Sequence, residues 1–413
     1  MIRCEARLLA PETDATTPSE EPPLSEPNPL RDLHIIDTDT HWTEPHDLWT
    51  SRVPASQRDL VPHVIEVDGQ QRWVADKDVD IGSAMPLSVV RKDGSKAIGL
   101  EWFEWGIEDT HEAAYEVGAR LAMMDSLGIF AQVVYPNVAG FGNQNFQKIN
   151  DRELRLLCAR TYNDAMAEVQ EQSGGRLFPM ALMPWWDIPA AAEEVQRVAE
   201  MGMRGVVTTP DPHTVDLPAL GQSDWDPFWD ACSQLGMPVN FHIGASDIGL
   251  SFFANAPWPS LDGPRQFLVG GMDLAMSNAR VLSNLIVSGV PERFPDCKFV
   301  SVESGIGWLP FYLEMLDYQM AQTAPGLLSM KPSEIFRRQI YATFWFEEMT
   351  PKHLLGEIGV ENIMFETDFP HATCLYPDGQ EHLQRVVSDL DDRTRRRVLQ
   401  DNASELYRID LPS

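Results

Sequence analysis

Short apolar segments alternate along most of the chain with longer stretches in which apolar residues recur every three or four positions. The short segments are rich in β-branched and aromatic residues and are bounded by glycine, proline or polar residues, which is typical of buried strands. The longer stretches, for example 118–128, 188–202 and 226–236, have the period of helices that cover a sheet. Strands are predicted in eight segments: IIDTDTH (35–41), FAQVVYPNV (130–138), LFPMALMPWWD (177–187), RGVVTTP (204–210), MPVNFHIG (237–244), CKFVSVESG (297–305), QIYATFWFE (339–347) and ENIMFETDFPH (361–371).

Strands that are separated mostly by helices form the pattern of parallel βαβ units. We therefore predict an α/β fold, a (β/α)8 TIM barrel over residues 33–408. A doubly wound sheet is the alternative, but no GxGxxG motif follows the first strand. The segment at about 60–118 contains VIEVDGQQRWVADKDVDIG and predicts a small β-rich insertion over the barrel mouth.

Composition adds a tail and limits the partners. Residues 1–32 are rich in proline, serine, threonine and acids and predict a disordered tail. No stretch approaches the roughly 18 apolar residues that a membrane-spanning helix needs. Lys+Arg 32 against Asp+Glu 62 gives a net charge of −30, which disfavours nucleic acid and anionic membranes and leaves a small-molecule substrate.

The cysteines indicate a reducing compartment. They lie far apart and contain no CxxC motif, so neither a disulfide framework nor a thiolate metal site is expected. We predict a cytoplasmic protein. The five are Cys4, Cys158, Cys232, Cys297 and Cys374.

The first predicted strand carries two carboxylates and an imidazole at alternate positions. Side chains two residues apart point to the same side of a strand, so Asp37, Asp39 and His41 are expected on one face. Buried carboxylates are unfavourable unless a cation or hydrogen-bond donors compensate them. A metal ion is the simplest compensation, although Asp and His are also common in turns and helix caps.

Later predicted strands end in similar residues, with His371 close behind the last of them. The carboxyl ends of the strands of a TIM barrel converge on the active-site face. Carboxylate and imidazole ligands without thiolate suit iron, manganese or zinc, and the oxygen bias favours the first two. We predict a metal site with five ligands: Asp39, His41, His242, Glu303 and Asp368.

Several segments together resemble the amidohydrolase-2 branch of the metal-dependent amidohydrolase superfamily. They are IIDTDTHWTEP, NFHIG, VSVESGIGWLPFYLEMLD, FETDFPH and the terminal DNASELY. The resemblance implies a TIM barrel with a metal at its mouth. It also implies an HxH pair or a carboxylate variant on the first strand, a His on the fifth and an Asp on the eighth. In this chain those positions are Asp39 and His41, His242, and Asp368.

The chain departs from the family pattern at two positions. Asp39 stands where decarboxylases of this kind often have His, and Glu303 stands where a catalytic histidine often ends the sixth strand. With Asp368 these residues place three negative charges in one site, more than one divalent ion neutralises. We therefore predict two divalent ions, iron or manganese favoured and zinc the alternative, with Glu303 bridging them.

Two ions favour hydrolysis by a metal-activated hydroxide. Asp368 is expected to carry the proton as well as to bind metal, and His371 to stand near the leaving group. Asp37 is expected to orient a ligand from behind. The predicted reaction is cleavage of an amide, ester or thioester bond in a bulky apolar or aromatic substrate.

Three further residues are candidate substrate contacts at the mouth: Asn137, Trp185 and Trp345. The tryptophans could instead pack helices onto the barrel. The same walls suit a nonoxidative decarboxylase of an aromatic carboxylic acid, and a noncatalytic metal-binding barrel is an alternative of another class. The amphipathic segment 307–320 suggests a homodimer.

Overall fold

The computed structural model describes residues 28–412. The predicted tail falls mostly on residues 1–27, which lie outside this range. Within the described part of that segment, Leu30 is only 5% exposed and packs against the main hydrophobic core. The folded part of the chain therefore begins a few residues earlier than the predicted boundary at 33.

Removing residues 1–27 is expected to leave the melting temperature nearly unchanged, because a proline-rich acidic segment has little apolar area to bury. Removing residues 1–32 also removes Leu30, whose burial contributes about 2 kcal/mol, and should lower the melting temperature. Thermal melts of the two truncations followed by circular dichroism make the comparison. A large drop with the shorter truncation would show that the tail packs on the barrel.

The structure is a barrel of eight parallel strands, as predicted. The strands are ordered β1-β5-β6 in one sheet and β7-β8-β9-β10-β11-β12 in the other. The strands β6 and β7 are two parts of one barrel strand, because Met180 between them donates its N–H to Val134 of β5. The barrel strands are β1 (Ile36–His41), β5 (Ala131–Tyr135), β6 (Leu177–Pro179), β7 (Ala181–Leu182), β8 (Val206–Val207), β9 (Val239–His242), β10 (Phe299–Val302), β11 (Ile340–Phe344) and β12 (Ile363–Phe365).

The barrel closes between its first and last strands. Thr40 of β1 forms a parallel bridge with Phe369, which follows β12. The N–H of His41 donates to the carbonyl of Phe369 at 2.7 Å, and the N–H of Asp368 donates to the carbonyl of Asp39 at 3.0 Å. Three of the predicted metal ligands thus lie on the segments that close the barrel.

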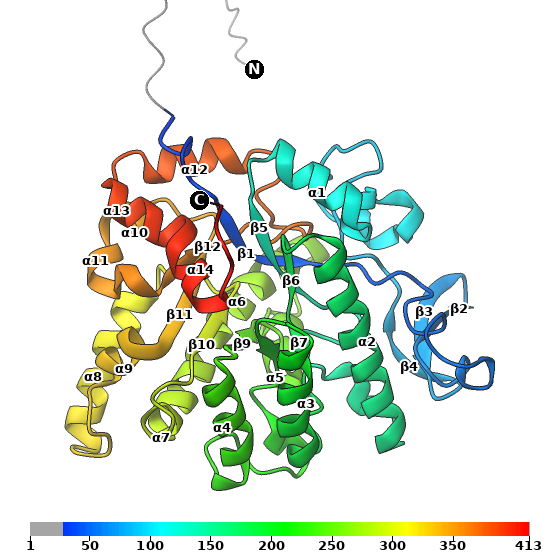
Figure 1. Ribbon diagram of the computed structural model, residues 1–413, viewed down its shortest axis with the longest axis horizontal. Helices are drawn as coiled ribbons and strands as arrows, with labels where there is room; N and C mark the ends of the chain where they lie inside the picture. The colour runs from blue at the N-terminus through cyan, green and yellow to red at the C-terminus, as the bar shows by residue number, and fades with distance from the viewer. Residues whose placement is uncertain (1–27, 413) are drawn as a thin grey trace, which may run out of the picture.

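Helices cover the outside of the barrel (Figure 1). Side-chain caps set several of their starts, since Asp151 accepts N–H bonds at the start of α2 and Asp187 does so for α3. The helices are α1 (Val117–Ser126), α2 (Arg152–Gln172), α3 (Ile188–Glu200), α4 (Asp226–Leu235), α5 (Asp247–Asn255), α6 (Gly263–Val287), α7 (Val290–Arg293), α8 (Leu309–Thr323), α9 (Pro332–Gln339), α10 (Met349–His353), α11 (Leu355–Ile358), α12 (Gly379–Val387), α13 (Asp392–Arg396) and α14 (Asn402–Tyr407).

The segment between β1 and α1 contains a separate antiparallel sheet of β2 (His63–Val67), β3 (Gln70–Ala75) and β4 (Val79–Ser83). Figure 1 shows this sheet at one edge of the molecule, at the right of the view. Further along the segment, the N–H of Val89 donates to the carbonyl of Pro370 at 2.9 Å. The segment therefore contacts the chain just beyond the carboxyl end of β12.

Other predictions concern the surface and the cysteines. None of the helices within residues 28–412 combines the length and apolar content needed to cross a membrane. The four cysteines in this range are buried and unpaired, and Cys4 lies outside it. Helix α8 exposes Phe311, Met315 and Tyr318, and a homodimer formed through this helix stays a prediction.

Candidate metal centre

The predicted ligands converge at the carboxyl ends of four strands, β1, β9, β10 and β12. The barrel thus brings together residues that lie far apart in the chain. Their potential ligand atoms form two overlapping groups, within each of which all atoms lie within 4.8 Å of one another. One group is Asp39, His41, His242 and Glu303, and the other is His41, Glu303, Asp368 and His371.

Two imidazoles present nitrogen atoms to the same point. The Nε2 atoms of His41 and His242 are 3.1 Å apart. Nδ1 of His242 is 2.8 Å from the carbonyl oxygen of Ile243 and so carries the proton, which leaves a lone pair on Nε2. Burial lowers the pKa of His242 to about 4 and lowers the pKa of His41 well below its usual value. Both imidazoles are therefore neutral, the form that binds a metal.

Asp39 is the carboxylate that most clearly requires a cation. It is fully buried, and neither of its oxygens has a hydrogen-bond partner among the described residues. Its Oδ1 lies 3.5 Å from Nε2 of His41, and its Oδ2 lies 3.5 Å from Nε2 of His242. Burial, and then the charges of Asp368 and Asp37, raise the pKa of Asp39 well above its usual value. Because unpaired buried carboxylates are strongly unfavourable, the site fits a divalent ion held by oxygen and imidazole nitrogen.

Glu303 is the carboxylate of the cluster nearest to solvent. Its side chain is 12% exposed, and its Oε2 is 3.3 Å from Nε2 of His242. Burial, followed by the charges of Asp368 and Asp39, raises the pKa of Glu303 well above its usual value. Glu303 and Asp368 have φ angles of 57° and 58°, a left-handed conformation that costs about 1–2 kcal/mol for such residues. Strain of this kind is typical of functional sites.

Asn137, in the loop after β5, determines the proton position on His371. Its Nδ2 donates to the carbonyl of Trp42 at 3.2 Å, so its Oδ1, 3.1 Å from Nε2 of His371, accepts the proton of that nitrogen. In neutral His371 the lone pair is then on Nδ1, 3.1 Å from Oδ1 of Asp368. The other oxygen of Asp368 accepts a hydrogen bond from the Thr373 hydroxyl at 2.9 Å. Asp368 and His371 can therefore exchange one proton.

Asp37 does not share the face of the other two side chains predicted in β1. The strands β1 and β5 pair through Asp37 and Gln132, and then through Thr40 and Val134, so β1 has one residue more between these pairs. The prediction of a common face is wrong, because the bulge interrupts the pattern in which successive side chains point to opposite faces of the strand.

On the outer side of β1, Asp37 accepts hydrogen bonds from the N–H and hydroxyl of Thr367, at 2.8 and 2.6 Å, and from the Gln132 amide at 3.1 Å. Burial raises the pKa of Asp37 to about 7. Because Thr367 immediately precedes Asp368, these bonds hold the segment after β12 against β1 behind the cluster. The orienting role predicted for Asp37 is compatible with this position and stays a prediction.

The two tryptophans predicted as substrate contacts are buried. Trp185 is 2% exposed and Trp345 is 5% exposed. The ring of Trp185 lies 6.0 Å from that of Trp186, and the ring of Trp345 lies 4.6 Å from that of Phe346, measured between centroids. Both rings pack against neighbouring rings, while the buried indole nitrogen of each has no hydrogen-bond partner among the described residues. Contact of either tryptophan with a substrate stays a prediction.

One further buried carboxylate, Glu366, is not predicted by the sequence analysis. Its Oε2 lies 3.3 Å from the backbone nitrogen of Glu303, and its Oε1 has no partner among the described residues. Burial, and then the charge of Asp39, raise the pKa of Glu366 well above its usual value. Glu366 and Asp368 are two residues apart in FETD, so the alternation rule applied to the first strand would have found it here.

A barrel of this kind with a carboxylate and imidazole centre belongs to a known class. The family model described as Amidohydrolase matches residues 36–409. The chain is a member of this family, as the sequence motifs suggest, and a metal-dependent enzyme of the amidohydrolase fold.

Individual relatives narrow the comparison. The gamma-resorcylate decarboxylase of Rhodococcus jostii (strain RHA1) is 26% identical over 309 residues, 70% of this chain and 87% of the relative. An amidohydrolase from Mycobacterium avium subsp. paratuberculosis K-10 has a TM-score of 0.70 at 22% identity, over 91% of this chain and 98% of its own. A dihydroxybenzoic acid decarboxylase from Polaromonas sp. JS666, solved with manganese and 2-nitroresorcinol, has a TM-score of 0.61 at 18% identity, over 91% and 97%.

The predicted reaction class is corrected by these relatives. The prediction of a hydrolase is wrong, because the curated relatives from Rhodococcus jostii and Rhizobium are gamma-resorcylate decarboxylases, and decarboxylases cleave a carbon–carbon bond. Hydrolysis is predicted only if a second cation must balance the excess charge of the carboxylates. Protons bound to crowded buried carboxylates balance it equally well.

Proposed function

We propose that the protein is a nonoxidative decarboxylase of an aromatic carboxylic acid that uses one divalent ion, with manganese favoured over iron and zinc. The observation that carries the proposal is the cluster around Asp39, whose two unpaired oxygens adjoin two neutral imidazoles. A 26% identical gamma-resorcylate decarboxylase supports the reaction class. One ion is preferred to the predicted two because the two ligand groups share His41 and Glu303.

Decarboxylation exchanges a carboxylate for a proton on the same carbon. The ring carbon takes up a proton, its bond to the carboxylate breaks, the electron pair of that bond restores the aromatic ring, and carbon dioxide leaves. Asp39, His41, His242 and Glu303 would hold the ion, which would supply positive charge for the oxygens of the substrate. The proton comes from the pair Asp368 and His371, whose facing atoms are 3.1 Å apart.

The manganese-loaded protein is expected to release carbon dioxide from a member of a hydroxybenzoate panel that includes 2,6-dihydroxybenzoate. Gas release coupled to loss of substrate absorbance is the measurement. A fully metal-loaded protein that is inactive on a broad panel of aromatic acids would contradict the proposal and favour the noncatalytic barrel.

Replacing Glu303 by glutamine keeps the shape of the side chain and removes its charge. Metal affinity is expected to fall by about 10- to 100-fold and turnover by on the order of 10². Elemental analysis and turnover on the same preparation are compared with Glu314→Gln, an exposed acid on α8. Unchanged metal content and rate would remove Glu303 from the centre, and about two ions per wild-type chain would refute the single-ion proposal.

A further inference from the structure

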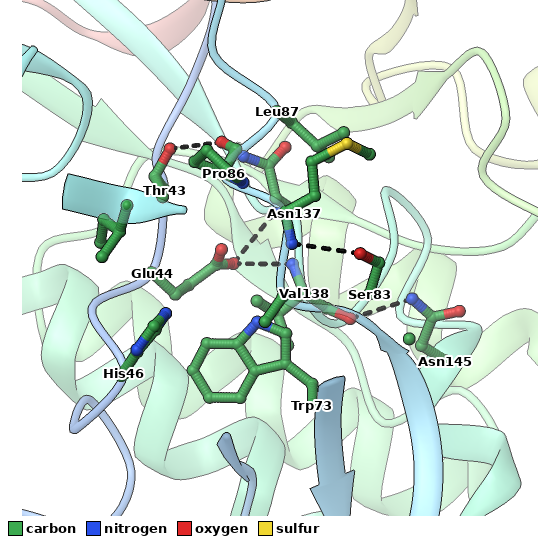
Figure 2. Close-up of a pocket in the computed structure, with 14 residues that line it drawn as sticks. Thr43, Glu44, His46, Trp73, Ser83, Pro86, Leu87, Asn137, Val138 and Asn145 are labelled. Carbon is green, nitrogen blue, oxygen red and sulfur yellow. Dashed lines mark hydrogen bonds between the residues drawn. The ribbon is translucent and has the colours of Figure 1, made fainter. Parts of the chain in front are cut away.

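A cavity of about 190 Å³ lies between the barrel and the segment that follows β1. We name it the Glu44 cavity. Figure 2 shows the Glu44 carboxylate directed toward Asn137 and Val138, with Trp73 and Ser83 of the antiparallel sheet nearby. The lining residues are Thr43, Glu44, His46, Trp73, residues 82–87, Ile107, Asn137, Val138 and Asn145.

Only one of the two oxygens of the Glu44 carboxylate has hydrogen-bond partners. Its Oε1 accepts hydrogen bonds from the backbone N–H groups of Asn137 at 2.9 Å and Val138 at 3.1 Å. Its Oε2 is buried and has no hydrogen-bond partner within the described part of the chain, although the residue is only 2% exposed. Burial raises the pKa of Glu44 to about 7. Glu44 lines the cavity, and an unpaired acceptor on a lining residue indicates a ligand that brings a hydrogen-bond donor.

The rest of the wall is mixed: it has an apolar part, formed by Trp73, Met85, Leu87, Ile107 and Val138, and polar side chains beside it. A cavity of about 150 Å³ lined by apolar side chains accommodates benzene. The Glu44 cavity can therefore hold one aromatic ring or a short apolar arm. The combination of a partly apolar wall and one unpaired acceptor is typical of a small-molecule subsite.

Asn137 connects this cavity to the metal cluster. Its backbone N–H bonds to Glu44, and its side-chain oxygen bonds to His371. We propose that the Glu44 cavity receives the distal part of the substrate, an apolar or aromatic group that ends in an O–H or N–H donor directed at Oε2 of Glu44. The inference rests on the proposed function and adds a substrate class: aromatic acids with a donor-bearing group remote from the carboxylate.

Crystals of the metal-loaded protein soaked with 4-bromophenol test occupancy. We expect bromine anomalous density inside the Glu44 cavity and the phenol oxygen within hydrogen-bond distance of Oε2. Titration calorimetry with phenol then measures affinity in solution. Glu44→Gln should weaken phenol binding about tenfold, because the amide replaces the unpaired acceptor oxygen by a donor. Ala84→Leu narrows the cavity without altering its charge and should abolish phenol binding. This variant tests the proposal if Glu44→Gln does not fold.

Glu347→Gln is the matched control. Glu347 also accepts N–H bonds from two backbone groups, of Ile306 and Gly307, but it does not line the cavity. The Glu347→Gln variant should bind phenol with the same affinity as the wild type. Glu44→Gln with a lowered melting temperature and unchanged phenol affinity would assign Glu44 a purely structural role and overturn the proposal.

The outcomes separate the two proposals. If bromine density is confined to the metal cluster and the protein decarboxylates aromatic acids, the proposal for the Glu44 cavity is refuted and the proposed function stands. Phenol bound at Glu44 in a metal-loaded protein that decarboxylates none of them refutes the proposed function and leaves the cavity as a ligand site.

Discussion

Replacing His41 or His242 by alanine is expected to yield a folded barrel that no longer retains its metal and decarboxylates at least about 10³-fold more slowly. Each residue is a neutral imidazole, and the two Nε2 atoms lie 3.1 Å apart beside the unpaired oxygens of Asp39. A loss of this size corresponds to about 4 kcal/mol of transition-state stabilisation, within the range that a metal supplies.

Elemental analysis and circular dichroism on the same preparations are the measurements. His353→Ala, at an exposed histidine on α10, is the control and should retain metal and activity. Full metal occupancy in either His41→Ala or His242→Ala would remove that residue from the ligand set.

Replacing His371 by glutamine is expected to lower kcat by about 10²–10⁴ while the metal content stays at the wild-type level. Nδ1 of His371 faces Asp368 and is the proposed partner in proton exchange, whereas the proposed ligands are Asp39, His41, His242 and Glu303. Glutamine retains polarity and approximate length but does not exchange a proton at neutral pH.

The matched variant is Asn137→Ala, which frees the His371 ring from its hydrogen bond at Nε2. It should also keep the metal and should lower kcat by roughly tenfold, because it disturbs only the orientation and tautomer of the imidazole. Loss of metal in His371→Gln would show that His371 is a ligand. An unchanged kcat would exclude it from the proton path.

The reaction class shows where reasoning from local charge fails. Asp39, Glu303 and Asp368 lie at strand ends, as predicted, and their crowding predicts two ions and hydrolysis. In the folded protein Glu366 joins them, and burial raises the pKa of Asp39, Glu303 and Glu366. Bound protons therefore compete with cations for the same excess charge, so carboxylate number does not determine ion number.

The sequence by itself determined the barrel and the gathering of carboxylates and imidazoles at the carboxyl ends of its strands. The strands can be located from short apolar runs, because the hydrophobic pattern that marks a strand involves only neighbouring residues. Asp39, His242 and Glu303 could be assigned to one site because the carboxyl ends of parallel barrel strands must converge.

Only the tertiary structure decided features that depend on the register or contact of distant segments. The bulge that turns Asp37 outward arises from the pairing of β1 with β5. The proton position on His371 depends on Asn137, 234 residues away in sequence. The Glu44 cavity exists only where the antiparallel sheet meets the loop after β5. Periodicity is a property of neighbouring residues, whereas register, tautomer and cavity shape are set by long-range packing that no local pattern contains.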